Sequence, residues 1–178
     1  MKSILIAIKP KWCAKIMNDE KTIEIRKTMP KCDLPIDVYI YCTKDEKYAN
    51  LINRGGFLTG MVVAKFTLNK VEEIKTCERH NPELLKQSCL NANEFYDYLT
   101  KGKNFLGQVL GYAWHIDNLE IFDEPKELSE FKHWVFYKEC SKCPYGKCDN
   151  DYGLCSQCCE IKPLAKAPQN YCYIETEN

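Results

Sequence analysis

A run of cysteines near the C-terminus constrains the fold more than any other feature of the sequence. The chain has twelve cysteines, and five of them form the spaced run C-x2-C-x4-C-x6-C-x2-C. Each C-x-x-C pair in this run is able to bind one side of a tetrahedral metal ion. The simplest set of four thiolate ligands is Cys140, Cys143, Cys155 and Cys158, with Cys148 and Cys159 as alternative ligands.

The redox compartment decides what these cysteines do. The apolar run Ile4 to Ile8 is too short for a signal peptide. No apolar run approaches the roughly 20 residues that span a bilayer. We therefore expect a cytoplasmic protein without a membrane segment, in which thiols stay reduced and metal binding is favoured over disulfides or free thiols.

Four thiolates would leave no open coordination position, so this metal would be structural. Zinc is favoured over an iron–sulfur cluster, which has the same ligands, because nothing else in the sequence indicates electron transfer. The sequence thus predicts one domain over residues 1–178, with a zinc-knuckle insert over residues 138–162 before the last strand.

Charge is distributed unevenly along the 178 residues, although the formal net charge is zero. Proteins that bind polyanions non-specifically are usually basic overall, so a nucleic-acid role here must rest on a local patch. The segment Lys2 to Lys31 has a charge balance of +5, and the segment Glu120 to Glu130 has a balance of −4. The alternative interpretation is that both segments are ordinary solvated faces.

Apolar periodicity predicts an α+β chain with five or six strands and short helices, which suits a small curved or closed sheet. Asn91 and Glu94 form the pattern of an N-terminal helix cap. Strands are expected at residues 3–8, 21–28, 36–42, 57–74 (one strand, or two joined by a bulge), 109–122 and 169–175. Helices are expected from residue 10 to about residue 18, at residues 93–100 and at residues 126–131, with one helical turn at residues 82–86.

The strand at residues 21–28 carries the first candidate site. Alternation places Thr22, Glu24 and Arg26 on one polar face, which we expect to be exposed, and Lys21 begins the strand. An arginine offers a planar donor fork for phosphate or a base edge. A glutamate beside two cations stays ionised, and it can accept a hydrogen bond from an amine or activate a water. The alternative interpretation is that these side chains form ordinary cross-strand ion pairs on an exposed face and bind no ligand.

Trp114 and His115 lie in a second apolar strand and form the other candidate site. A tryptophan among β-branched residues is usually a core residue, and stacking on a base is the alternative. His115 lies on the same strand face as Asp117, so it is either an oriented imidazole or a structural histidine.

The sequence resembles the ASCH domain family of the PUA-like superfamily. The resemblance rests on Lys9-Pro10, on the Lys21-Thr22-x-Glu24-x-Arg26 strand, on the long strand from Gly60 and on the strand at residues 111–116. The closing segment, residues 167–175, looks like the end of phage- and prophage-type members. The resemblance implies a small β-barrel with helices at its openings, and a cleft for RNA or nucleotides lined by the strand that carries Glu24.

The resemblance also implies two enzymatic activities. Some small members deacylate modified cytidine, and others have been linked to RNA cleavage. The deacylases use a lysine, a threonine three residues later and a distant glutamate. Lys21 matches the lysine, but Glu24 occupies the threonine position, and Thr22 is the candidate substitute. This departure weakens the expectation of threonine-based catalysis.

Three functions follow as hypotheses. The first is binding of RNA, a nucleotide or a modified nucleoside, with phosphate held by Lys9, Lys21 and Arg26, a base edge read by Glu24, and a ring stacked on Trp114 or Tyr112. The second is hydrolysis, with Glu24 as general base and Lys21 stabilising the oxyanion. The third is a phage-type protein-interaction module that docks through the cysteine run or the acidic segment.

Overall fold

The computed structural model describes residues 2–45, 59–101, 109–136 and 159–176. The described strands form two sheets, one of seven strands in the order β7-β4-β3-β1-β10-β8-β9 and one of three strands in the order β2-β6-β5. The strands are β1 (Lys2–Ile8), β2 (Ile23–Arg26), β3 (Ile36–Cys42), β4 (Val62–Leu68), β5 (Val71–Lys75), β6 (Leu110–His115), β7 (Asp117–Lys126), β8 (Lys132–Phe136), β9 (Cys159–Pro163) and β10 (Tyr171–Glu175). The α-helices are α1 (Pro10–Met17), α3 (Pro82–Ser88) and α4 (Ala92–Thr100), and the 3-10 helices are η2 (Thr76–His80) and η3 (Leu128–Glu130).

The predicted α+β class is confirmed, but the described residues hold ten strands rather than five or six. Each of the two regions predicted as a long strand forms two strands in the structure. The region at residues 57–74 holds β4 and most of β5, and the region at residues 109–122 holds β6 and most of β7. β8 and β9, which flank the cysteine run, were not predicted. The helix predicted at residues 126–131 was wrong in extent, because β7 continues to Lys126 and only η3 follows it.

A long two-stranded ribbon joins the two sheets. The pairing of β4 with β7 continues past the bend as the pairing of β5 with β6, since Thr67 lies opposite Asp117 and Val71 lies opposite Trp114. One half of the ribbon therefore belongs to the large sheet and the other half to the small sheet. Among the described residues, no strand ladder between β2 and β1 closes the two sheets into a barrel.

The main core lies at the centre of the large sheet. β1 pairs with β3 in parallel and with β10 antiparallel, and its central residues Ile4, Leu5 and Ile6 have no exposed surface. A strand buried on both faces reads as a continuous apolar run, as this one does in the sequence. Directly after β1 in the chain, α1 begins at Pro10 and buries Cys13 and Ile16 against this core.

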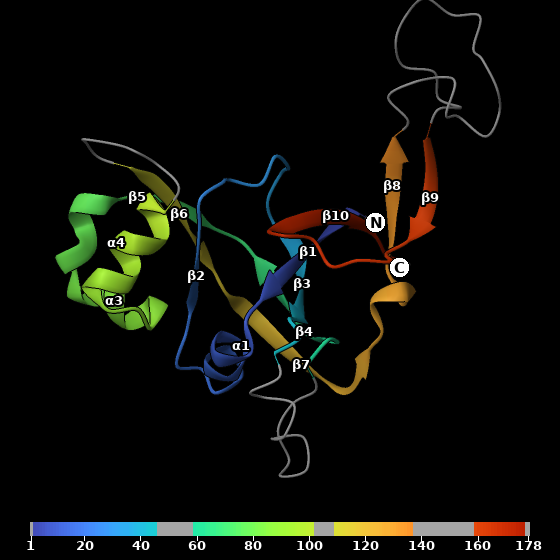
Figure 1. Ribbon diagram of the computed structural model, residues 1–178, viewed down its shortest axis with the longest axis horizontal. Coiled ribbons are helices and arrows are strands. Elements are labelled where there is room, and N and C mark those ends of the chain that lie inside the picture. Colours follow the sequence, from blue (N-terminus) through green and yellow to red (C-terminus); the bar gives the residue numbers. More distant parts are fainter. Residues whose placement is uncertain (1, 46–58, 102–108, 137–158, 177–178) are drawn as a thin grey trace, which may run out of the picture.

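A second core lies between the small sheet and the helices α3 and α4. Ile23 and Ile25 of β2 pack here with Phe95 and Leu99 of α4. Asn91 caps α4, and Glu94 returns a hydrogen bond to the backbone N–H of Asn91, so the predicted capping box is confirmed. Figure 1 shows α3 and α4 at one end of the molecule and the β8–β9 hairpin at the other.

In the part of the chain that the structure describes, no helix has the length and apolar character that crossing a bilayer requires.

Candidate functional site

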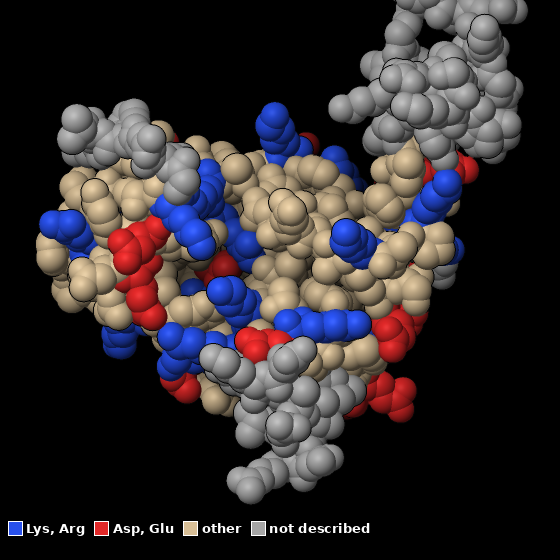
Figure 2. Space-filling view, viewed as in Figure 1, with Lys and Arg blue, Asp and Glu red and all other residues tan. Residues whose placement is uncertain are grey.

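A pocket of about 300 Å³ lies along the free edge of β2, between α1 and α4. Its size is at the lower end of the range for small-molecule sites, about 300–1,000 Å³. Figure 2 shows a hollow over this region with acidic atoms inside it and basic side chains around it. The lining residues are Trp12, Lys21, Glu24, Ile25, Leu90, Glu94, Asp97 and Tyr98.

A buried cluster of charge adjoins the pocket, and two of its three members, Lys21 and Glu24, line it. Lys21, Glu24 and Arg26 are only 3%, 8% and 6% exposed. The sequence predicts a solvated polar face for this strand, and that prediction was wrong for Glu24 and Arg26. The polar face of β2 turns inward toward α1 and the large sheet, while Ile23 and Ile25 face the second core. Thr22 precedes the strand and is exposed.

Glu24 holds this cluster together. Its Oε2 lies 3.2 Å from Lys21 Nζ, and its Oε1 lies 3.3 Å from Arg26 Nε. The second contact is an ion pair without hydrogen-bond geometry, since Arg26 Nε has no acceptor in line among the residues that the structure describes. Lys21 Nζ also donates a 2.8 Å hydrogen bond to the carbonyl oxygen of Ser88 at the end of α3. One carboxylate therefore lies against two buried cations, and the three side chains together carry a net charge of +1.

The end of the Arg26 side chain is held by the protein itself. Nη1 donates to Asn170 Oδ1 at 2.9 Å, and Nη2 donates to the carbonyl oxygen of Ala7 at 2.8 Å. These bonds connect β2 to β1 and to the segment before β10. The guanidinium of Arg26, predicted from the sequence to hold phosphate, thus donates to acceptors of the protein itself. Lys9, at the N-cap of α1, is exposed but outside the pocket lining.

Two aromatic rings line the pocket from opposite helices, Trp12 from α1 and Tyr98 from α4. The ammonium of Lys11 lies 4.3 Å from the centroid of the Trp12 ring, and that of Lys21 lies 5.3 Å from it. Lys27 Nζ lies 5.5 Å from the centroid of Tyr98. Burial raises the pKa of the Tyr98 hydroxyl, and the positive charge of Arg26 opposes this rise. Both rings thus have cations over them.

α4 adds two carboxylates, Glu94 and Asp97. The backbone N–H of Asn91 and the ammonium of Lys11 lower the pKa of Glu94, so this group is ionised at neutral pH. Sequence reasoning identified Glu94 only as a cap. The spacing of Glu94, Asp97 and Tyr98 at i, i+3 and i+4 places them on one helix face, a signal that could have found this wall.

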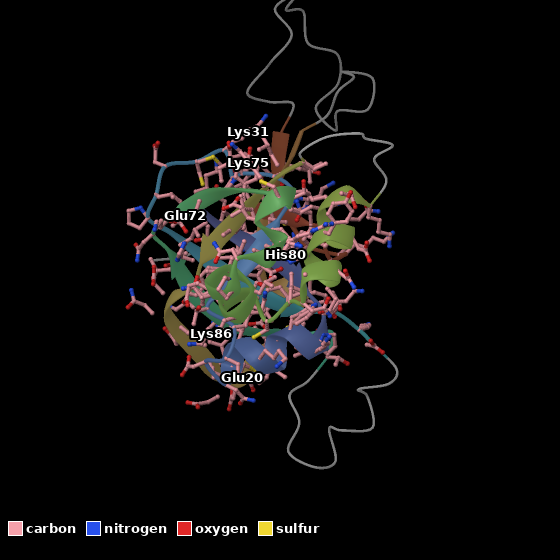
Figure 3. The ribbon with its side chains drawn as sticks, turned by 90° about the vertical axis from the view of Figure 1, so that its left-hand side faces the viewer. Glu20, Lys31, Glu72, Lys75, His80 and Lys86 are labelled. Atoms are coloured by element: carbon pink, nitrogen blue, oxygen red, sulfur yellow. The ribbon has the colours of Figure 1, made fainter. Side chains whose placement is uncertain are left out.

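The other predicted contacts lie elsewhere. Trp114 is paired with Glu24 across the β2–β6 ladder, but its ring is fully buried and packs on Tyr171 at 5.2 Å between centroids. His115 points to the opposite face of the strand, where Nε2 lies 2.8 Å from Glu72 Oε2. In Figure 3, Glu72 lies toward the left of the view and α4 toward the right. The structure therefore does not bring Trp114 or His115 into the pocket lining.

The predicted metal ligands Cys140, Cys143, Cys148, Cys155 and Cys158, and the side chain of Cys159, lie outside the described part of the chain. Among the residues that the structure does describe, no group of three or more histidine, cysteine or acidic side chains is placed to hold a metal ion.

Comparison with known proteins identifies the fold. No family model matches the sequence, and no curated protein matches it significantly. The crystal structure of ASCH from Zymomonas mobilis matches with a TM-score of 0.58 and 14% identity, over 97% of this chain and 87% of that one. A serine-to-alanine variant of that protein gives a TM-score of 0.58 at 13% identity, covering 97% and 88% of the two chains. A tyrosine-to-phenylalanine variant gives 0.53 at 13% identity, covering 88% and 93%. The chain therefore has the ASCH fold, as the resemblance in its sequence predicted.

Proposed function

We propose that this protein belongs to the ASCH family and binds a nucleotide or a modified base of RNA in the pocket between α1 and α4. The observation that carries the proposal is a buried carboxylate, Glu24, facing a pocket with an aromatic ring on each side. Flat aromatic walls favour stacking of a base, and an ionised carboxylate accepts hydrogen bonds from exocyclic amines.

The charges of the pocket favour a base inside it and phosphate outside it. Among the described residues that line the pocket, three are carboxylates, Glu24, Glu94 and Asp97, and one, Lys21, carries an ammonium. The carboxylates of this lining would repel phosphate. The exposed Lys9 at the start of α1 lies outside the lining, so it can contact phosphate without this repulsion. We therefore assign phosphate contacts to Lys9, outside the pocket lining, and base recognition to Glu24.

Calorimetric titration of short RNAs and nucleosides tests this function. Trp12→Leu removes one aromatic wall and should weaken binding by about 1–3 kcal/mol, the usual contribution of base stacking. The matched control is Trp134→Leu, which changes an exposed tryptophan on β8. Equal affinity of the wild type and Trp12→Leu, or no binding by either, contradicts the proposal.

Hydrolysis of an acylated nucleoside or of RNA is the second candidate function. It is favoured by the 3.2 Å contact between Lys21 and Glu24, both of which line the pocket. Glu24 would activate a water, and Lys21 would stabilise the oxyanion that develops on the substrate. Thr22, which lies outside the lining, gains no support as a nucleophile. Release of acetate from acetylcytidine that persists in Glu24→Gln would exclude this role for Glu24.

We also propose that the cysteine run binds structural zinc through Cys140, Cys143, Cys155 and Cys158, in a protein of the cytoplasm. The β8–β9 ladder supports this proposal, because Phe136 lies opposite Cys159. The segment that carries both C-x-x-C pairs therefore begins and ends at one place, which shortens the loop that metal binding must close. Metal analysis of the purified protein should find one zinc per chain, lost in Cys143→Ser but retained in Cys77→Ser.

We also propose that the protein is a phage- or prophage-type member of the ASCH family and that its two sheets form a barrel-like body. Arg26 supports such a body, since its hydrogen bond to Ala7 connects β2 to the neighbouring strand β1 where no backbone ladder does.

A further inference from the structure

Two residues that line the pocket between α1 and α4, Trp12 and Glu94, contact a cation of the protein itself. Lys11 Nζ lies 4.3 Å from the centroid of the Trp12 ring and 3.3 Å from Glu94 Oε1. The side chain of Lys11 is 50% exposed, so the ammonium is able to leave this position for solvent. An aromatic face attracts organic cations, and a carboxylate beside it adds a charge of the opposite sign. The pocket thus offers a cation site that a side chain occupies.

Glu94 is held in place independently of Lys11. Its Oε2 accepts the backbone N–H of Asn91 at 3.1 Å, as the second half of the helix cap, and Oε1 faces Lys11. The cap fixes the carboxylate before any ligand arrives, which lowers the entropic cost of binding. Asp97, which lies one turn further along α4, adds a second negative charge to the same wall.

The remaining charges decide which ligand suits this site. Lys21 also lies near Trp12 and pairs with Glu24, so the lining carries three carboxylates against this one ammonium. The carboxylates of Glu94 and Asp97 are then left in excess once Lys11 has moved away. A neutral base would leave this excess uncompensated, whereas a cationic base would neutralise part of it.

We propose that the pocket selects a base with a positively charged ring, such as N7-methylguanine or 1-methyladenine, over the neutral parent base. The cationic ring would stack on Trp12 in the place of the Lys11 ammonium, with Glu94 beside it and Tyr98 on the opposite wall. Glu24 would accept from an N–H of the base edge. This inference rests on the proposed base-binding function and specifies its ligand class.

Paired nucleosides test the charge preference directly. Calorimetry would compare N7-methylguanosine with guanosine, and 1-methyladenosine with adenosine, slightly below neutral pH where both methylated bases are cationic. We expect the cationic member of each pair to bind on the order of tenfold more tightly. Equal binding of the two members overturns the charge preference but leaves base binding intact. Binding of no nucleoside overturns the proposed function as well.

Two substitutions separate charge from shape. Glu94→Gln keeps the helix cap, because glutamine also serves at this capping position, and removes only the charge. It should weaken binding of the cationic nucleoside several-fold and binding of the neutral one much less. Lys11→Met removes the competing ammonium and should strengthen binding of the cationic nucleoside. The proposal is refuted if either variant changes both members of a pair equally, or if a trimethyllysine peptide binds more tightly than the cationic nucleosides.

Discussion

Arg26 on β2 donates a 2.8 Å hydrogen bond from Nη2 to the backbone carbonyl oxygen of Ala7 on β1. These strands belong to different sheets, and no backbone ladder joins them. The same guanidinium reaches Asn170, which in turn donates to Thr28 Oγ1 at 3.0 Å. One side chain therefore ties the edge of the small sheet to the centre of the large sheet.

Replacement of Arg26 by lysine should destabilise the protein although the charge is kept. A lysine has no planar fork and cannot reach Ala7 and Asn170 together in the same geometry. We expect the free energy of unfolding to fall by about 1.5–3 kcal/mol, the usual contribution of hydrogen bonds from a charged group. Urea denaturation measures this, with the exposed Arg79→Lys as control. Equal midpoints for the two variants would contradict the bridging role.

Glu24→Gln tests the buried charge cluster. The substitution keeps the shape of the side chain but leaves the cations of Lys21 and Arg26 without a counter-charge in a buried site. Breaking a buried ion pair from one side costs about 3–5 kcal/mol, so a large fall in the urea midpoint is expected. Glu20→Gln breaks the exposed Lys15–Glu20 pair and should leave the midpoint unchanged. If both variants behave alike, Glu24 is not the charge that stabilises this cluster.

The stability of the protein should fall at alkaline pH because two residues of β10, Cys172 and Tyr173, have raised pKa values. Burial raises the pKa of Cys172 from 9.0 to about 11 and the pKa of Tyr173 from 10.0 to about 12. Both groups hold their protons more tightly in the folded chain. Their contribution to stability is therefore fully present below the unfolded pKa values and is lost as pH rises through the folded ones.

Urea midpoints measured at a series of alkaline pH values check this expectation. Cys172→Ala should flatten the decline between pH 9.0 and about 11, because it removes the thiol whose pKa is raised over that interval. Cys77→Ala removes an exposed thiol and should leave the decline as it is in the wild type. A decline that is identical in all three proteins would show that Cys172 makes no contribution to it.

Gly111→Ala should strain the contact between β6 and α4. A Cβ at this position would lie 2.4 Å from Leu99 Cδ2 and 3.3 Å from the carbonyl oxygen of Arg26. Leu99 is fully buried and has little room to move, so overpacking should cost about 1–3 kcal/mol. In a double-mutant cycle with Leu99→Ala, the combined loss should be smaller than the two single losses added together. Additive losses would place the strain elsewhere.

Much of the local structure could be predicted from the sequence. Asn91 and Glu94 form the predicted capping box, and β3 has the predicted bounds at residues 36–42. These features depend on contacts between residues close in the chain, or on an apolar run long enough to require burial. The same reasoning missed β8 and β9, since their pairing depends on partners separated by the cysteine run.

The candidate site was predicted only in part. The spacing of Lys21 and Glu24 indicated a charged cluster, and both residues line the pocket. The walls Trp12 and Tyr98 were missed as site residues because helical spacing describes a buried face equally well. Trp114 was considered for stacking, but it lies in the core.

The sequence by itself determined which residues of β2 share a face, because side chains alternate along any strand. Only the tertiary structure decided where that face points. α1 and the large sheet cover it, so Glu24 and Arg26 are buried, and each buried charge then needs a partner. Arg26 finds its partners at Ala7 and Asn170, which are distant in the chain, and no local pattern encodes such contacts.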